Sequence, residues 1–234
     1  MKLTRAVCAV VLFVASCVPV RAMPPVVWLD DFIGMKLDAR YSISTVGTGF
    51  IRVSPNITIG GWAELYTLAS GSGTARFRLG EEPSGCSTCP IILNWYVSKN
   101  ASMEARVILN TATKVDATVG FVGLNDPNVV VAALVRENLW YFQVYNVSAG
   151  LQYSAVTTFH HVPGDVYLVR IETIAVPVPT ARLLVDGVVY AELTDPRVPL
   201  SGLLPELQIW NYPLSSAWSQ VTLWVDILSL TQDR

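Results

Sequence analysis

The segment Leu183-Leu184-Val185-Asp186-Gly187-Val188-Val189-Tyr190 predicts a tight β-hairpin. Asp-Gly supplies the two positive φ angles of a type I′ turn, and apolar residues flank it on both sides. Glu137-Asn138, between apolar runs at 130–135 and 139–145, is a weaker signal of the same kind. The chain is therefore expected to contain antiparallel strands joined by short turns.

Strand-like patterns continue on both sides of this hairpin. Residues 103–110 place Met103, Ala105, Val107 and Leu109 on one face and mostly polar side chains on the other, as a half-buried strand does. Turn-forming residues interrupt such runs roughly every eight to twelve residues. The candidate strands are 49–54, 62–69, 74–79, 91–97, 103–110, 114–122, 129–135, 139–145, 151–159, 166–174, 181–185, 188–193, 206–211 and 221–230.

The absence of other patterns favours one domain. No window of about 11 or more residues keeps a helical apolar stripe without Gly or Pro, and no internal repeat or linker divides the chain. An all-β domain with about 12–14 antiparallel strands in two packed sheets is the economical interpretation.

Composition excludes several classes of protein. The chain has 234 residues, of which 52% are hydrophobic and 15% charged, with a formal net charge of -2. A disordered chain has lower hydrophobicity and higher charge. A nucleic-acid partner is not expected, because there is no basic excess to neutralise phosphates.

Residues 1–22 have the pattern of a secretory signal peptide. Lys2 and Arg5 precede an apolar run at 6–18, and the small residue Ala22 marks a cleavage position. That run is too short to cross a bilayer, and no later stretch reaches about 18 apolar residues, so no transmembrane helix is expected. The sequence predicts an extracellular or cell-surface protein with a folded domain at 23–234.

Two alternatives for the amino terminus remain open. Val14-Ala15-Ser16-Cys17 is similar to a bacterial lipobox, in which Cys17 would carry a lipid anchor. Translation from Met23 would instead leave no signal peptide.

Two kinds of covalent modification fit an exported chain. Cys86 and Cys89 lie among turn-forming residues and are expected to form a local disulfide, since one CxxC pair is at most half a zinc site. Asn56, Asn100 and Asn146 begin Asn-x-Ser/Thr triplets and are candidate glycosylation sites.

Three segments carry a resemblance to a known superfamily. They are Trp28-Leu29-Asp30-Asp31-Phe32-Ile33-Gly34 with Leu37-Asp38 and Tyr41, the Asp186-Gly187 hairpin, and the closing Leu223-Trp224-Val225-Asp226-Ile227-Leu228-Ser229-Leu230. They resemble the opening, the hairpin and the last strand of concanavalin A-like lectins and glucanases of the laminin-G/laminarinase type, in which the last strand pairs near the first. The resemblance covers residues 27–234 and implies an antiparallel two-sheet jelly-roll sandwich.

The catalytic motif of the enzymatic members is missing. Laminarinase-type hydrolases carry Glu-x-Asp-x-(x)-Glu on one strand, where alternate carboxylates share a face. This chain has no Glu-x-Asp, so we expect a protein that is not an enzyme. His160 and His161, its only histidines, are expected at a solvated strand end before Pro163-Gly164.

A sugar-binding role has candidate residues in the strand at 139–145. Trp140, Phe142 and Val144 form one set, and Tyr141, Gln143 and Tyr145 form the other, with a polar group on each side chain. The second set is the candidate ligand-binding set, because sugar sites combine aromatic rings with a few polar groups. The alternative is that both sets pack internally. Further candidates for exposed rings are Trp95, Tyr96, Trp210, Tyr212 and Trp218.

No cofactor is expected apart from a structural calcium ion. Asp30, Asp31 and Asp38 could supply its oxygen ligands near a sheet edge. The alternative is that these carboxylates cap turns near Gly34.

We therefore expect an exported, non-catalytic carbohydrate-binding or adhesion module whose partner is a glycan or cell-surface component. The runner-up is a structural subunit of an extracellular or viral assembly that self-associates. Charge is sparse, with Lys36, Lys99 and Lys114 the only lysines after residue 22, and sheet edges are normally protected by charge. A divergent glycoside hydrolase is the third hypothesis.

Overall fold

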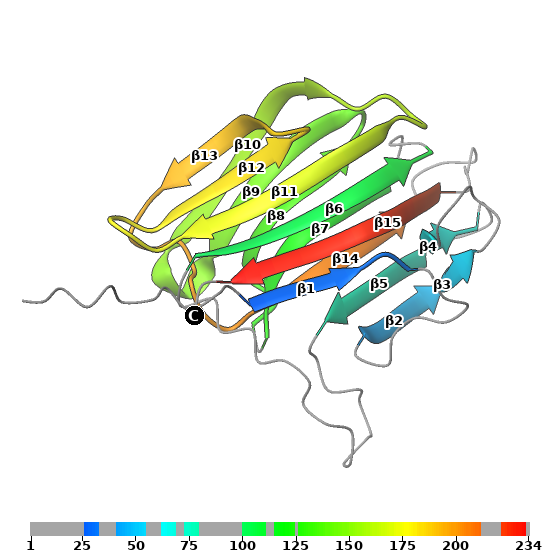
Figure 1. The fold of residues 1–234 in the computed structure, drawn as a ribbon, viewed down its shortest axis with the longest axis horizontal. Coiled ribbons are helices and arrows are strands. Elements are labelled where there is room, and N and C mark those ends of the chain that lie inside the picture. Colours follow the sequence, from blue (N-terminus) through cyan, green and yellow to red (C-terminus); the bar gives the residue numbers. More distant parts are fainter. Residues whose placement is uncertain are drawn as a thin grey trace, which may run out of the picture.

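The computed structural model describes residues 26–32, 41–54, 62–68, 73–79, 100–110, 115–124, 126–211 and 221–232. These residues form two antiparallel sheets that pack face to face, as Figure 1 shows. The two-sheet jelly-roll sandwich expected from the sequence is confirmed.

Each sheet joins a run of consecutive strands to strands from distant parts of the chain. The eight-stranded sheet has the order β13 (Val188–Thr194), β12 (Thr180–Val185), β11 (Val166–Ile174), β6 (Ala101–Leu109), β15 (Val221–Gln232), β4 (Trp62–Thr67) and β3 (Gly49–Ser54), and β1 (Val26–Asp30) also pairs with β15. The seven-stranded sheet has the order β10 (Leu151–His160), β9 (Leu139–Asn146), β8 (Val129–Arg136), β7 (Val115–Gly123), β14 (Leu203–Asn211), β5 (Gly73–Leu79) and β2 (Tyr41–Gly47).

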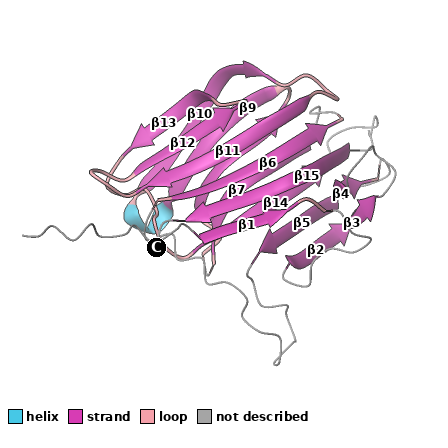
Figure 2. Cartoon of the chain, in the orientation of Figure 1, coloured by secondary structure: helices cyan, strands magenta, loops and turns pink. Residues whose placement is uncertain are grey.

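Helical structure is limited to one turn in the described part of the chain. This turn, η1 (Val147–Ala149), is a 3-10 helix between β9 and β10 and is the only helix in Figure 2. No helix among the described residues is long and apolar enough to cross a membrane.

Both short hairpins form as expected. Asp186 and Gly187 have φ angles of 51° and 79° between β12 and β13, and Glu137 and Asn138 have 50° and 63° between β8 and β9. Two consecutive residues with positive φ give a turn whose twist matches that of the flanking strands.

The core lies between the sheets and follows the two-residue period of the strands. Met103, Ala105, Val107 and Leu109 of β6 are buried as expected, and they face inward-pointing residues of the other sheet such as Val119. Phe77, Trp140 and Phe142 are among the largest fully buried side chains. Burial of each such side chain contributes about 1.5–3 kcal/mol.

Most of the expected strands are present, with shifted ends. β1 and β2 were absent from the expected set, although Trp28 and Tyr41 belong to the superfamily resemblance. The strand expected at 91–97 lies outside the described residues. So do residues 1–22 with Cys17, and the candidate modification sites Asn56, Cys86 and Cys89.

Candidate functional site

The outer face of the seven-stranded sheet, which points away from the other sheet, carries the candidate site. In β9 the inward side chains Trp140, Phe142 and Val144 are at most 2% exposed. The alternate side chains Tyr141, Gln143 and Tyr145 point outward and are half-buried. The two sets assigned from the sequence are therefore confirmed as an inner and an outer set.

The outer β9 residues are flanked by small or polar neighbours. On β10, Gln152 lies beside Tyr145 and Ser154 beside Gln143 in the strand register, and both are exposed. On β8, Ala132 lies beside Gln143. The row therefore has exposed hydrogen-bonding groups on one side and a small, fully buried residue on the other.

Tyr145 lines a surface pocket of about 440 Å³. Its other lining residues are Asn128, Val147, Gln152 and Ser154. Tyr141 and Gln143 do not line this pocket and continue along the same face. An aromatic ring, two amides and a hydroxyl around one pocket are the groups that hold a sugar ring and orient its hydroxyls.

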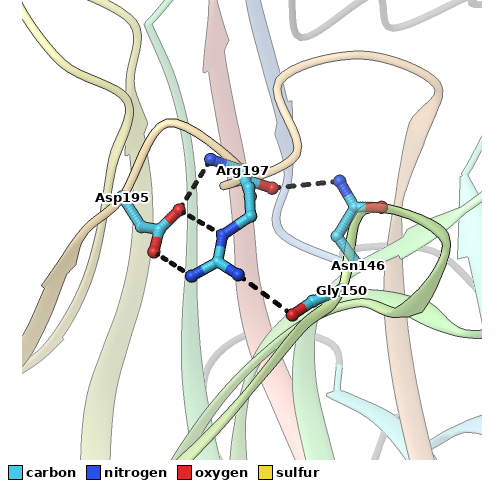
Figure 3. Close-up of polar contacts among 4 residues, drawn as sticks. All are labelled: Asn146, Gly150, Asp195 and Arg197. Atoms are coloured by element: carbon cyan, nitrogen blue, oxygen red, sulfur yellow. Dashed lines mark hydrogen bonds and ion pairs between the residues drawn. The ribbon is translucent and has the colours of Figure 1, made fainter.

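A bridge from the β13–β14 connection fixes the turn that follows Tyr145, as Figure 3 shows. The Arg197 guanidinium donates to both Asp195 carboxylate oxygens, at 2.9 and 2.7 Å, and to the Gly150 carbonyl at 3.1 Å. The Asn146 amide nitrogen donates to the Arg197 carbonyl at 3.0 Å. Hydrogen bonds from Arg197 lower the pKa of Asp195 to about 2, so the bridge stays charged in neutral solution.

A charged cluster lies across the same face, on β5 and β14. Glu206, whose side chain is 4% exposed, forms ion pairs with Arg78 and with Arg76, the latter at 3.8 Å. The alternation in Thr74-Ala75-Arg76-Phe77-Arg78 predicts that both arginines share a face. Glu206 is 128 residues away from Arg78 along the chain, so the cluster had no local signal.

A second ion pair lies at one end of this face. Arg136 of β8 donates to Asp116 of β7 through Nε at 2.7 Å and Nη2 at 2.5 Å. Trp210 of β14 is opposite Asp116 in the register and is 45% exposed, which agrees with the exposed ring expected from the sequence.

One cross-strand row between β9 and the charged cluster consists of very small residues. Gly120 of β7 lies between Ala132 of β8 and Glu206 of β14 in the register. A Cβ atom on Gly120 would come within 2.5 Å of the Val131 carbonyl oxygen and the Ala132 Cα, so no larger residue fits without moving the backbone. The polar side chains of β9 and those of the charged cluster are therefore separated, in this row, by residues that have no long side chain.

The expected calcium ligands are only partly described. Asp30 uses its Oδ1 to accept the Phe32 N–H at 2.8 Å, which is the turn-capping alternative. Asp31 is exposed, and Asp38 lies outside the described residues. Among the residues that the structure describes, no group of three or more His, Cys, Asp or Glu side chains could hold a metal ion.

Two of the candidate glycosylation sites are described. Asn100 is exposed, and its Oδ1 accepts the Ala175 N–H at 3.0 Å. Asn146 ends β9 beside the pocket and accepts the Ser148 hydroxyl at 3.1 Å. Both remain predictions.

Comparison with known proteins supports the fold class. No protein-family model matches the chain, and no match was found among curated proteins. The structure is similar to an endo-beta-1,4-glucuronan lyase from Trichoderma reesei, with a TM-score of 0.66 and 9% identity over 88% of this chain and 94% of the lyase. It is also similar to the Emp47p carbohydrate recognition domain, with a TM-score of 0.58 and 11% identity over 88% and 95% of the two chains.

A third similar structure is that of botulinum neurotoxin type C, whose cell entry depends on interaction with two ganglioside molecules. The TM-score is 0.54 and the identity 10%, over 83% of this chain and 44% of the toxin chain. At such identities the likeness shows the jelly-roll fold alone.

Proposed function

We propose that this protein is an exported, non-catalytic carbohydrate-binding or adhesion module that binds a glycan on the outer face of its seven-stranded sheet. The observation that carries the proposal is the outward row of Tyr141, Gln143 and Tyr145 on β9. The inward residues Trp140, Phe142 and Val144 are the part of this strand that lies in the core. Two tyrosines and an amide on the outer face have no packing role between the sheets, and they match the groups that stack on and orient sugars.

The similar structures support a glycan as the partner. One is a carbohydrate recognition domain, one acts on glucuronan, and one depends on gangliosides for cell entry. The export part of the proposal rests on the sequence of residues 1–22, and the cell surface or exterior is the proposed location.

The carboxylates on this face favour binding over hydrolysis. In its described part the outward-facing acids on the strands are Asp116 and Glu206, and both are engaged by arginines. A retaining glycosidase instead needs two carboxyl groups about 5–5.5 Å apart, one acting as nucleophile and one as acid/base. Arginine-paired, buried carboxylates are poorly placed for either role.

The experiment is a glycan-array screen of the full chain, with calcium and with a chelator. We expect reproducible binding that falls at least tenfold in a Tyr141→Ala/Tyr145→Ala double variant, because ring stacking is lost. Tyr66→Ala, a half-buried tyrosine on the outer face of the other sheet, is the matched control and should bind normally. Loss of binding with the chelator would support a calcium ion near Asp30.

Two results would contradict this proposal. A folded protein that binds no glycan under either condition would exclude the lectin role. Cleavage of a bound glycan, glucuronan above all, would exclude the non-catalytic part.

One observation favours the assembly subunit as a second candidate. The edge strands β13, β10, β3 and β2 contain no lysine, and β13 exposes Val188 and Val189 at 53% and 49%. Edges of this kind can pair with another chain. Concentration-dependent association of the pure protein, lost in a Val189→Lys variant, would support this role.

A further inference from the structure

The outer face of the seven-stranded sheet holds more guanidinium groups than carboxylates. Its strands carry Arg76, Arg78 and Arg136 against Asp116 and Glu206 in the described residues. Arg136 and Asp116 neutralise each other, so the excess lies in the cluster of Arg76, Arg78 and Glu206. The whole chain is acidic, with 18 Asp and Glu against 16 Lys and Arg, which makes a local positive excess informative.

Arg76 is the arginine of this cluster whose guanidinium keeps accessible hydrogen-bond donors. Arg78 is held tightly by Glu206, and its side chain is 11% exposed. The Arg76 side chain is 31% exposed, and its Nε lies 3.8 Å from the same Glu206 oxygen, a contact too long for a hydrogen bond. A guanidinium that keeps donors accessible beside a neutralised pair can receive an anion in bidentate geometry.

The neighbours of Arg76 complete a binding site for an acidic sugar. In the register Gln208 of β14 lies beside Arg76 on one side and Ser44 of β2 on the other, both partly exposed. Trp210, two residues beyond Gln208, offers an exposed ring on the same face. An amide and a hydroxyl can bind the remaining oxygens of the anion while the ring stacks on the sugar.

We infer that the glycan bound by this face is anionic, with a carboxylate or sulfate group held by Arg76, Gln208 and Ser44. This inference rests on the proposed function and names its ligand class. Tyr141 lies in the same cross-strand row as Arg76, four strands away, which is about 19 Å at the usual strand spacing. A ligand that contacts both residues is an oligosaccharide lying across the strands.

The test compares three ligands of equal length by calorimetry with the full chain. They are a β-1,4-linked glucuronate oligosaccharide, the neutral β-1,4-glucose oligosaccharide and a sulfated form of the latter. We expect at least one anionic ligand to bind ten times or more tightly than the neutral one, and added salt to weaken only the anionic complex. The comparison of glucuronate with sulfate identifies which acid group is preferred.

Variants assign the preference to the site. Arg76→Gln is expected to reduce anionic affinity about tenfold or more, to the level of the neutral ligand. Arg182→Gln is the matched control, because Arg182 is 36% exposed on the outer face of the other sheet and also pairs with a glutamate. Thermal unfolding of each variant checks that the sheet is intact.

The outcomes separate this inference from the proposed function. Equal affinity for neutral and anionic ligands, both dependent on Tyr141 and Tyr145, would overturn the inference and keep the lectin. An anionic preference that survives Arg76→Gln would overturn the assignment to this site. Absence of binding to any glycan would overturn both proposals.

Discussion

His161 lies in the core at 3% exposure, although the sequence predicted a solvated strand end for both histidines. His160 is exposed as expected. The segment that follows His161 folds back over it. This places Tyr167 next to His161, and the Tyr167 hydroxyl oxygen accepts the Val162 N–H at 2.8 Å. The His161 ring lies 5.4 Å from the Tyr167 ring and 6.3 Å from the Trp140 ring, with Nε2 3.2 Å from the Leu109 carbonyl oxygen.

This burial predicts an acid sensitivity of the fold. Burial lowers the pKa of His161 below its usual 6.5, with the Leu109 carbonyl and Asp165 acting weakly in the other direction. The unfolded chain therefore binds the proton more readily, so stability is complete above about pH 6.5 and is lost as pH falls towards the folded-state pKa. The free energy of unfolding should decline from pH 7 to pH 5, with a slope that corresponds to the uptake of at most one proton by His161 on unfolding.

Variants that cannot be protonated test the assignment. His161→Gln and His161→Phe should flatten the decline measured by urea unfolding at several pH values. His160→Gln, at the exposed neighbour, should leave the slope unchanged. A wild-type slope retained in both His161 variants would show that another group is responsible.

Residue-level prediction succeeded where the two-residue period was enough. It separated Tyr141, Gln143 and Tyr145 from the inner set of β9, because strand alternation alone determines the face. It missed the cluster of Arg76 and Glu206, because their proximity depends on which strands are neighbours. No local pattern encodes that order.

At the scale of elements, the Asp186-Gly187 turn does more than reverse the chain. Asp186 donates its N–H to the Leu168 carbonyl at 2.9 Å, and its Oδ1 accepts the Leu168 N–H at 2.9 Å. The turn between β12 and β13 is thereby attached to the end of β11, and one aspartate satisfies both backbone groups of a strand residue.

Substitutions at this turn should separate backbone strain from side-chain bonding. Gly187 has a φ of 79° with open space around its Cα, so Gly187→Ala should cost about 1–2 kcal/mol through strain alone, and Gly187→Asn less. Asp186→Ala should cost more than about 1 kcal/mol, because it leaves the Leu168 N–H without its acceptor and also places alanine at a positive φ, and Asp186→Asn less. Chemical denaturation measures all four, and an Asn variant as costly as Ala at position 187 would contradict the strain argument.

Pro205 explains one element whose start was misplaced. β14 begins at Leu203, whereas the sequence placed its start at 206. Among the described residues, 203–205 pair with β7 alone, and pairing with β5 begins at Glu206. Because no described strand pairs with this part of β14 on the β5 side, the missing N–H of Pro205 is tolerated there.

At the scale of the whole molecule, β15 organises the eight-stranded sheet. One side of β15 pairs with β6, and the other pairs with β4 at residues 221–225 and with β1 at residues 228–232. The β1–β15 pair joins positions about 200 residues apart, and Val26 is directly opposite Gln232. The sequence predicted two sheets, and the superfamily resemblance alone placed the last strand near the first.

This closeness predicts that the domain tolerates circular permutation. A short flexible linker from residue 232 to residue 26, with new ends in the exposed turn between Pro163 and Gly164, should give a folded protein. Its thermal unfolding should stay cooperative. An insoluble or non-cooperative permutant would show that the covalent order of β1 and β15 matters beyond their pairing.

The same pair affects how the molecule responds to mechanical load. Antiparallel ladder bonds run perpendicular to the strands, and residues 26 and 232 lie opposite each other at one end of the β1–β15 ladder. Tension between residues 26 and 232 therefore loads the bonds one pair at a time, as in a zipper. Single-molecule pulling from these positions should release β1 at low force.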